Sequence, residues 1–274
     1  MTTTLRPSGP LHESSKGAKS RDYDVCVNSR PVGRIKLATH AAFGPGVAEI
    51  LDLRIDDPDR GRGRATVAAL AAEEVARGWG CARIEAIVPA GAPGALALAT
   101  ALGYVERNRL MAKPLPLSPP ELPEGTTARA MTEDEYTAWV GHTRAAYAQD
   151  WIDRGVPAAQ AHAKAEADMS SSLADGLATP GARLSVLAHG DEVVGTLWVA
   201  ERGSEIYVYD IEVRAEHRGR GYGRGLMLLA ERQCLEAGKD RVGLNVFAGN
   251  TPALRLYESL GYEATAYAVY KPLL

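Results

Sequence analysis

The amino-acid sequence predicts an α/β protein, more narrowly α+β, that consists of two similar domains, the first of them shortened. A shift of 158 residues lays the sequence over itself without a gap, so that Arg60-Gly61-Arg62-Gly63 falls on Arg218-Gly219-Arg220-Gly221. A repeat of this length indicates two related domains rather than a solenoid of short repeats. Both copies also show the same order of predicted strands and helices around this glycine-rich string.

The second copy begins with a predicted meander of three strands and continues with alternating helices and strands. Alternating apolar residues and the Gly190-Asp191 turn indicate the first strands, and apolar residues at helical spacing before Gly238 indicate a helix with a glycine C-cap. In chain order we expect strands at 183–188, 193–201 and 205–213, a helix at 224–237, a strand at 242–246, a helix at 252–259 and a strand at 267–271.

Two further helices are expected in the second copy alone. The first copy repeats the order of elements from Tyr23 onward but has no counterpart of residues 126–180. In that segment Thr132 and Glu135 have the spacing of a capping box, and residues 157–173 form a polar, alanine-rich run.

A linker is expected between the copies, because residues 114–125 contain five prolines, which forbid helix and disfavour a central strand. We therefore expect a disordered tail at 1–19, a shortened domain at 20–113, the linker at 114–125 and a larger domain at 126–274.

The composition is that of an ordinary globular protein. With 46% hydrophobic residues, 24% charged residues and a net charge of −3, the chain gives no reason to expect nucleic acid or a membrane as partner. No apolar run suits a signal peptide or a membrane span, so we expect a cytosolic protein. The three cysteines form no close pair and are expected to be buried thiols, and no metal is expected.

The glycine-rich loop at residues 218–223 is a candidate anion site. It stands between a predicted strand and a predicted helix, whose N-terminus offers unpaired N–H groups and the positive end of the helix dipole. Glycines let the backbone approach a pyrophosphate closely. The loop lacks the lysine and Ser/Thr of a Walker motif, and the strand before it belongs to a meander, which disfavours nucleoside triphosphates and NAD.

The linked motifs of the second copy resemble the GNAT superfamily of acyl-CoA-dependent N-acetyltransferases. The family pattern Arg/Gln-x-x-Gly-x-Gly/Ala is met by Arg218, Gly221 and Gly223, and Asn250 and a helix ending in Leu-Gly-Tyr262 follow at the usual distance. The resemblance implies two GNAT-like domains, each a mixed, mostly antiparallel sheet flanked by helices, with the N-terminal one shortened.

The resemblance implies acetyl-CoA as co-substrate and no metal. The loop would hold its pyrophosphate, and the strand backbone before the loop would pair with the pantetheine arm, with the acetyl group near the Val213 amide. The residues implied in cofactor binding are Ile211, Val213, Arg218, Gly219, Arg220, Gly221, Tyr222, Gly223 and Asn250.

The same resemblance implies an acid and a base for acetyl transfer. Tyr257 falls where many members place a tyrosine near the CoA sulfur, as a proton donor to the leaving thiolate. Tyr207 stands where some members place a glutamate base. For the base, Glu212 is the first choice, Asp210 on the same strand face is the second, and a water relay under Tyr207 is the third.

The first copy is expected to be non-catalytic. The counterparts of Tyr257, Asn250, Glu212 and Asp210 are Ala99, Ala92, Arg54 and Asp52. Its loop still satisfies the cofactor pattern, and Glu49 corresponds to Tyr207, where a base could stand. Binding of CoA without reaction and a purely structural glycine turn are both open for this copy.

The acceptor is expected to be the amine of a small molecule, such as an antibiotic, a polyamine or a metabolite. In the family the two early helices set substrate choice, which here makes Tyr147, Asp150 and Trp151 candidate wall residues. Mycothiol synthase is also a tandem member, so a cysteinyl amine is an alternative, although the shortened copy and Tyr207 differ from it. Further alternatives are a peptide or protein amine and a non-catalytic CoA sensor or scaffold. We expect a monomer with intramolecular domain pairing.

Overall fold

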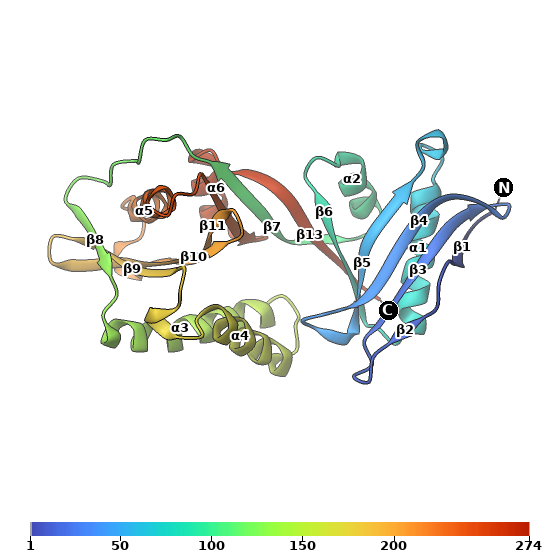
Figure 1. The fold of residues 1–274 in the computed structure, drawn as a ribbon, viewed down its shortest axis with the longest axis horizontal. Coiled ribbons are helices and arrows are strands. Elements are labelled where there is room, and N and C mark those ends of the chain that lie inside the picture. The colour runs from blue at the N-terminus through green and yellow to red at the C-terminus, as the bar shows by residue number, and fades with distance from the viewer. Residues whose placement is uncertain (1, 274) are drawn as a thin grey trace. The chain divides into compact units, whose positions relative to one another are not determined.

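The computed structural model describes residues 2–273, which form two compact units (Figure 1). Unit 1 consists of Met1–Arg109 and Ala266–Leu274, and unit 2 consists of Leu110–Thr265. Each unit holds a mixed sheet with flanking helices, which confirms the predicted fold class.

Unit 1 contains a sheet in the order β1-β3-β4-β5-β6-β13, with the short β2 paired to β3. Its elements are β1 (Thr3–Pro7), β2 (His12–Glu13), β3 (Lys19–Val27), β4 (Arg30–His40), β5 (Gly44–Ile55), α1 (Arg64–Gly78), β6 (Arg83–Pro89) and α2 (Pro93–Ala101). The strands pair antiparallel except for β5 and β6, which are parallel.

The N-terminal segment forms strands, although its composition predicted a disordered tail. β1 pairs antiparallel with β3 from Thr3 opposite Val27 to Pro7 opposite Tyr23. Leu5 packs against the core cluster beneath this edge. An edge strand needs only backbone pairing on one side and one apolar anchor, and composition does not report either.

Unit 2 has the sheet order β7-β12-β11-β10-β9-β8. Its elements are β7 (Val105–Pro114, entering from unit 1), β8 (Thr126–Ala130), α3 (Glu133–Ile152), α4 (Ala158–Ser172), β9 (Ala182–His189), β10 (Glu192–Arg202), β11 (Glu205–Val213), α5 (Tyr222–Glu236), β12 (Arg241–Phe247), α6 (Thr251–Ser259) and β13 (Glu263–Pro272, leaving for unit 1). The predicted meander, both added helices and the Thr132–Glu135 capping box are confirmed.

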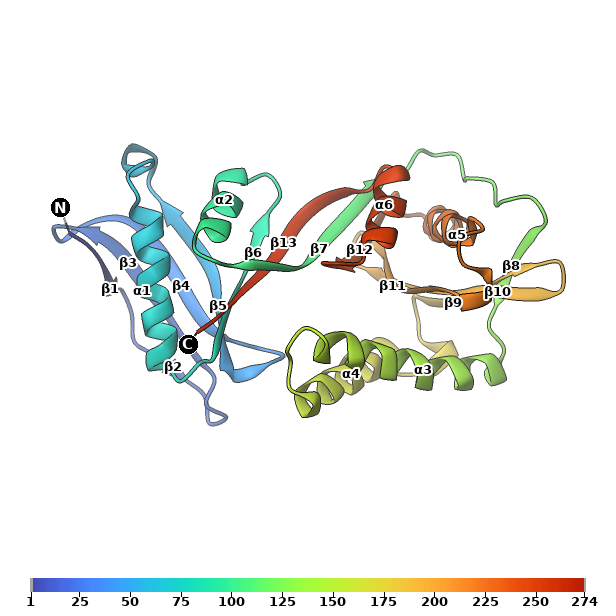
Figure 2. The same ribbon diagram turned by 180° about the vertical axis from the view of Figure 1, so that it is seen from behind.

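The helices cover the two sheets differently. In unit 2, α3 and α4 lie on one face, and α5 and α6 lie on the other (Figure 1). In unit 1, α1 crosses one face of β3, β4 and β5 (Figure 2), and among the described residues no helix covers the opposite face of these strands (Figure 1). The helices missing from the first copy therefore leave one sheet face without a helical layer.

Each core is centred on the helix that follows the glycine loop. In unit 2, Leu226 and Met227 of α5 are fully buried against Leu197 of β10 and Leu244 of β12. In unit 1, small alanines of α1 pack against Val25, Val32, Ile35 and Leu37. The three cysteines are buried and free, as predicted.

The last strand of each copy lies in the unit formed by the other copy. β13 pairs antiparallel with β6, with Tyr270 opposite Glu85, whereas β7 lies beside β12. The sequence-based division at 20–113 and 126–274 keeps each strand with its own copy, so the structure divides the chain differently.

Matching ion pairs fasten the two exchanged strands. In unit 1 Lys271 Nζ lies 2.8 Å from Glu73 Oε2, and in unit 2 Lys113 Nζ lies 2.7 Å from Glu231 Oε1. Both glutamates are buried on the helix after the glycine loop, and each lysine ammonium lies over the tyrosine ring of a Leu-Gly-Tyr string. A buried carboxylate needs such a partner.

The repeat is gapless only from the third strand of each meander onward. In the preceding hairpins, Gly33 pairs with Ile55 and Gly195 pairs with Val213, and these two glycines are 162 positions apart rather than 158. The chain from Gly33 to Ile55 is longer than the chain from Gly195 to Val213 by this difference. The expectation of a gapless match is therefore corrected, because hairpin loops tolerate insertions that the paired strands do not.

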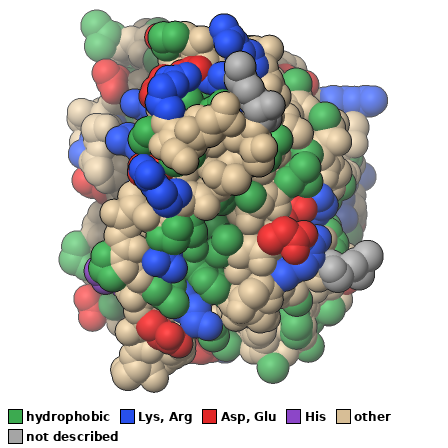
Figure 3. Space-filling view, turned by 90° about the vertical axis from the view of Figure 1, so that its right-hand side faces the viewer, with side chains coloured by type: hydrophobic (Ala, Val, Ile, Leu, Met, Phe, Trp, Pro, Cys, Tyr) green, Lys and Arg blue, Asp and Glu red, His purple; other side chains and the backbone are tan. Residues whose placement is uncertain are grey.

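The proline-rich segment after β7 runs along unit 2. Its Leu115 N–H donates to the Asp240 carbonyl at 2.7 Å, and Arg232 donates to the Pro120 carbonyl at 3.1 Å. Within residues 2–273 we find no helix with the length and apolar character needed to cross a bilayer. On the face drawn in Figure 3, lysines and arginines form separate clusters with apolar side chains and carboxylates between them.

Candidate functional site

The glycine loop of unit 2 ends at the N-terminus of α5. Gly219 and Gly221 have φ of 77° and 85°, a left-handed conformation that favours glycine, and Gly221 is the N-cap residue. Gly223 lies inside the first turn, where a Cβ would approach Leu256 Cδ2 to 3.1 Å. Arg218 is exposed and donates through Nε to the Val213 carbonyl at 3.1 Å, which holds the loop against the end of β11.

Beside the loop, β11 and β12 separate. Their parallel pairing runs from Ile206 and Val242 to Val208 and Leu244, while the strands continue to Val213 and Phe247. The end of β11 that includes Ile211 and Val213 therefore has a backbone edge turned toward the opening. Such an edge can pair with an extended, amide-bearing ligand.

A β-bulge lies where the two strands part. Trp198 of β10 pairs with Asp210, whereas Val199 pairs with Val208, so Tyr209 is the extra residue on β11. The bulge switches the alternation of side chains, because Val208 and Ile211 both pack in the core beneath α5 although they are three positions apart.

Asp210 and Glu212 lie on the face covered by α3, as their alternation predicted. Trp139 Nε1 of α3 donates to Asp210 Oδ2 at 3.1 Å, and His142 Nε2, one turn further along, lies 3.3 Å from Glu212 Oε2. The bulge brings Tyr209 to this face too, where its ring stacks on Trp198 at 4.6 Å.

The two carboxylates differ in their surroundings. The pKa of Asp210 is raised to about 6, because burial and the nearby Glu212 carboxylate raise it by more than the Trp139 hydrogen bond and His142 lower it. Glu212 is more open, with 37% of its side chain exposed, and Arg218 lies 3.9 Å from it in addition to His142. Asp210 therefore has the character of a base that titrates near neutrality, whereas Glu212 is a paired surface carboxylate.

Tyr257 and Asn250 belong to α6. Tyr257 is 5% exposed, and burial, together with the nearby Asp210 carboxylate, raises the pKa of its phenol to about 12. Tyr257 and Asp210 are thus close enough to interact electrostatically. Asn250 is the N-cap of α6, and its Oδ1 accepts the Ala253 N–H at 3.2 Å, so a structural role accompanies any contact with a cofactor.

The loop residues Arg220 and Tyr222 lie on different sides of the helix start. Arg220 is exposed, whereas Tyr222 is partly buried, with its ring 5.7 Å from His189 and 6.1 Å from His217. His217 is itself only 5% exposed. Tyr222 therefore contributes packing as well as its N–H at the helix N-terminus.

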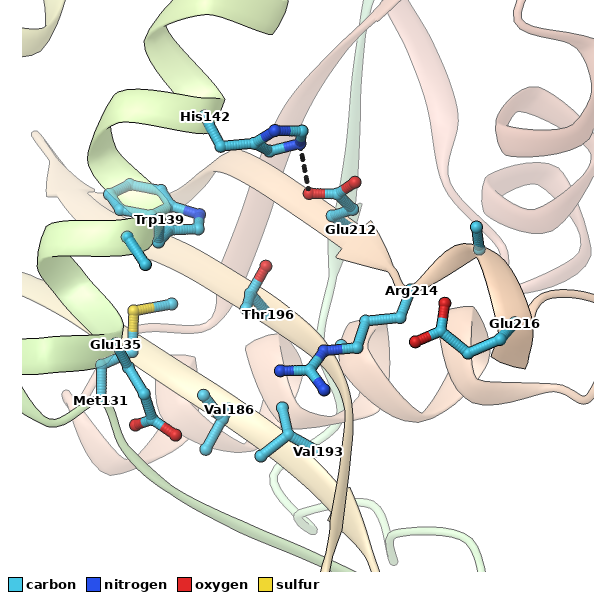
Figure 4. A pocket seen from close by; sticks show the side chains of 13 residues that line it. Met131, Glu135, Trp139, His142, Val186, Val193, Thr196, Glu212, Arg214 and Glu216 are labelled. Carbon is cyan, nitrogen blue, oxygen red and sulfur yellow. Dashed lines mark ion pairs between the residues drawn. The ribbon is translucent and has the colours of Figure 1, made fainter.

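A pocket of about 380 Å³ lies between α3 and the sheet of unit 2 (Figure 4). Its walls include Trp139 and Met131, and its rim carries Glu135, Glu212 and Glu216. In Figure 4 the Arg214 guanidinium extends into the pocket toward Thr196 and Val193, and His142 points at Glu212. Two of these carboxylates are ion-paired, Glu135 with Arg129 and Glu212 with His142, and Arg214 adds a basic group to the lining.

An aromatic cluster lies on the same sheet face toward the start of β11. The Tyr207 ring lies 5.0 Å from the Tyr209 ring and carries the Arg202 guanidinium at 3.7 Å. Of the predicted wall residues, Tyr147 and Trp151 contact each other at 6.0 Å, and Trp151 also meets Phe247 of β12 at 5.3 Å. The third, Asp150, pairs with Arg154 in the turn after α3.

Comparison with known proteins decides the family. The profile of the acetyltransferase (GNAT) family matches residues 7–104 and, a second time, residues 137–262, which together make up most of the chain. The chain belongs to the GNAT family. Because each match falls on one copy, it is a tandem GNAT acetyltransferase.

Three relatives show how far the likeness extends. A mycothiol acetyltransferase of Thermomonospora curvata is 34% identical over 218 residues, covering 77% of this chain and 67% of that protein. A GCN5-related N-acetyltransferase from Sphaerobacter thermophilus has a TM-score of 0.60 at 20% identity, covering 92% of this chain and 80% of that one. A tandem GNAT protein from the clavulanic acid biosynthesis pathway has a TM-score of 0.52 at 21% identity, covering 96% and 85%. The two structures support the fold.

Two residues at this GNAT site were missed in the sequence. Trp139 and His142 hold Asp210 and Glu212 from α3. Their spacing of three positions places them on one helix face, which is a signal for a shared target. The sequence does not show which strand residues that face meets.

Proposed function

We propose that unit 2 transfers the acetyl group of acetyl-CoA directly to the amine of a small molecule. The observation that carries this proposal is that Asp210 lies on β11 just beyond the last residue that pairs with β12, close enough to Tyr257 of α6 for its carboxylate to interact electrostatically with the phenol. One is a carboxylate that titrates near neutrality, and the other is a phenol that keeps its proton. Membership in the GNAT family supports the reaction class.

The residues of unit 2 fit acetyl-CoA. The left-handed Gly219 and Gly221 and the amides at the start of α5 would receive the pyrophosphate, and the free edge of β11 at Ile211 and Val213 would pair with the pantetheine amides. A Cβ at Gly223 would crowd Leu256 beside this path. When bound, acetyl-CoA supplies an acetyl group activated as a thioester.

Asp210 is the base that we assign first. An amine is mostly protonated in water and must lose a proton to attack the thioester carbonyl. A carboxylate with a pKa near 6 is ionised at neutral pH and is a stronger base than an ordinary aspartate. Trp139 holds one carboxylate oxygen, which fixes the direction of the other. Glu212, the first choice from the sequence, is already paired with His142.

Tyr257 is the proton donor. Its raised pKa keeps the phenol protonated at neutral pH, so it has a proton to give to the departing CoA sulfur. Its ring is buried, which holds the hydroxyl in one direction without competition from solvent. After the transfer, Asp210 carries an extra proton and Tyr257 lacks one. Each residue returns to its starting state by exchanging a proton with solvent or with the other residue.

A small cationic acceptor fits the α3 face. Glu216 on the rim of the pocket in Figure 4 would attract a protonated amine, and the Trp139 ring in the wall offers a face for its cationic or apolar parts. The relative from Thermomonospora curvata is named for mycothiol, so the amine precursor of mycothiol belongs among the acceptors to be tried.

The test is an acetylation assay on the full chain with acetyl-CoA and a panel of small amines, with peptides for comparison. We expect release of free CoA thiol and an acetylated product with at least one small amine. Gly221→Glu should abolish both, because it fills the loop with a side chain and a negative charge. Gly141→Glu is the matched control, since Gly141 is an exposed residue of α3 with open space around it. Acetylated product from peptides alone would overturn the assignment of a small-molecule acceptor. Binding of acetyl-CoA without any acetylated product would overturn the proposal that unit 2 is catalytic.

A further inference from the structure

Unit 1 contains a cavity of about 770 Å³ where β5 and β6 separate. The parallel pairing of these strands runs from Val47 and Arg83 to Ile50 and Ala86, while the strands continue to Ile55 and Pro89. The last residues of both strands line the cavity, together with α2 and the start of α1. The copy without a catalytic tyrosine has thus kept an open, extended site.

One end of this cavity favours phosphate. Gly61 and Gly63 line it in the left-handed conformation, with φ of 70° and 71°, and Gly63 is the N-cap of α1. Arg54, Arg60 and Arg64 line the same end.

The acidic residue at this end is already neutralised. Asp59 also lines the cavity, but Arg30 donates two hydrogen bonds to its carboxylate at 3.0 and 2.8 Å, and Arg64 pairs with it as well. The balance of charge at the loop is therefore positive, as a pyrophosphate requires.

The other end is apolar and wide. Ala99 and Ala92 stand where unit 2 has the buried Tyr257 and the capping Asn250. Leu51 and Ile87 are 50% and 56% exposed and both line the cavity, although such side chains favour burial. Replacing a phenol by a methyl group leaves space that an acetyl group does not fill. A longer hydrocarbon chain would cover the two exposed side chains.

We propose that unit 1 binds a CoA thioester whose acyl chain is longer than acetyl, and holds it without transferring it. The phosphate end, the free edges of β5 and β6 and the apolar end match the pyrophosphate, the pantetheine amides and the acyl chain in that order. Unit 1 has no counterpart of Tyr257 or of α3 and α4, so it lacks the proton donor and the helices expected to set acceptor choice. This inference concerns unit 1 alone and stands whether or not unit 2 transfers acetyl groups.

The test is calorimetric titration of acetyl-CoA, hexanoyl-CoA and CoA into the full chain carrying Gly221→Glu. This substitution blocks the glycine loop of unit 2, so that binding to unit 1 is measured alone. We expect one site that binds hexanoyl-CoA more tightly than acetyl-CoA by between about tenfold and a few hundredfold, depending on how many of the added methylenes are buried. Arg220→Glu, an exposed charge reversal in the same loop of unit 2, serves as a second background in case the glycine variant is poorly folded.

A matched variant separates chain length from CoA binding. Ala99→Tyr restores in unit 1 the ring that unit 2 has at Tyr257, and should remove the preference for hexanoyl-CoA while weak binding of CoA survives. Gly63→Glu in the same background should abolish binding of all three ligands. A background variant that binds none of them, or that binds acetyl-CoA as tightly as hexanoyl-CoA, would overturn the proposal. Acetylation of amines by the chain without these substitutions, measured in parallel, tests unit 2 separately.

Discussion

Units 1 and 2 share a scaffold but differ in the groups that chemistry needs. Both have a left-handed glycine at the N-cap of the first helix, a bulge on the third strand of the meander and a parallel pair that separates after it. Only unit 2 adds α3 and α4, and it has Tyr257 at the position where unit 1 has Ala99. In unit 1 the aspartate that corresponds to Asp210 is Asp52, which pairs with Arg34 on an exposed surface.

The difference shows that the ligand-binding geometry and the catalytic environment are separable. Asp52 and Asp210 occupy the same strand position, yet only Asp210 meets a helix that desolvates it and supplies a hydrogen bond. The pKa of a carboxyl group is set by what covers it, not by its place in the strand. Adding two helices to one copy therefore changes the chemistry of a residue that both copies have kept.

Replacing the two aspartates gives the largest expected contrast. Asp210→Asn should lower turnover by about 10²- to 10⁴-fold, because the neutral amide cannot accept the proton of the amine. Asp52→Asn should leave turnover unchanged. Steady-state rates with a saturating acceptor measure both. Equal activity of the two variants would assign the base elsewhere, first to Glu212.

The buried glutamates should behave alike in stability although the units differ in chemistry. Glu231→Gln and Glu73→Gln each leave a lysine without its carboxylate, and each should lower the free energy of unfolding by about 3 kcal/mol. Urea denaturation followed by circular dichroism measures this.

The control for this pair is an exposed glutamate. Glu236→Gln on α5 removes a pair with Arg183 in which the Glu236 side chain is 54% exposed, and should change the free energy by less than about 0.5 kcal/mol. A large effect in only one of the two buried positions would show that the exchanged strands are not held equivalently.

Asp210 should also lower the stability of unit 2 at neutral pH, where its carboxylate is ionised. Its pKa is raised by folding, so its contribution is most favourable below the unfolded value near 3.8 and is lost as the pH rises through about 6. Asp210→Asn should therefore stabilise the protein by about 2 kcal/mol at pH 7.5 and by much less at pH 4. Thermal unfolding at the two pH values tests this sign, and a variant less stable at pH 7.5 would contradict it.

Tyr257→Phe should have a smaller effect on turnover than the aspartate change. Loss of the hydroxyl removes the proton donor but leaves the ring, so we expect a fall of about ten- to a hundredfold in kcat with little change in the affinity for acetyl-CoA. Rates and calorimetry on the same preparation separate the two. Tyr262→Phe, at the neighbouring buried tyrosine, is the control, and a similar loss there would point to packing rather than proton donation.

His142 should change the pH profile only slightly. Activity should rise with pH as Asp210 ionises, with a midpoint near the pKa of about 6. A protonated His142 lowers that pKa, whereas Glu212 raises it, so His142→Asn should move the midpoint to higher pH by a few tenths of a unit. His162→Asn, at an exposed position of α4, should leave it in place. A shift to lower pH would contradict the assigned arrangement.

Much of the scaffold could be predicted from local sequence. The glycine loop, the Thr132–Glu135 capping box and the meander each depend on residues that are close in the chain. The bulge at Tyr209 depends on register with a partner strand, and Trp139 meets Asp210 only through the rotation of α3 against the sheet. No local pattern encodes the bulge or this contact, so the sequence alone could not decide between Glu212 and Asp210 as the candidate base.

The exchanged strands could not be predicted for a different reason. Both copies end in Lys-Pro-Leu, at Lys113 and Lys271, and both offer a buried glutamate as partner. Because both strands carry the same lysine, each could pair in either unit, and the sequence does not show which unit each strand joins. The path of the chain between the two strands decides which unit each one joins, and that path is a property of the whole fold.

The exchange also has a consequence for biosynthesis. Translation delivers β6 long before β13, which completes the sheet beside it. The usual sequence of events, in which an N-terminal domain finishes folding while the rest is still being made, is not open to unit 1. Until β13 emerges, β6 presents an unpaired edge and Glu73 lacks its lysine. During this interval that edge is open to association with neighbouring chains, and the sheet of unit 1 is completed only after the strands of unit 2 have been synthesised.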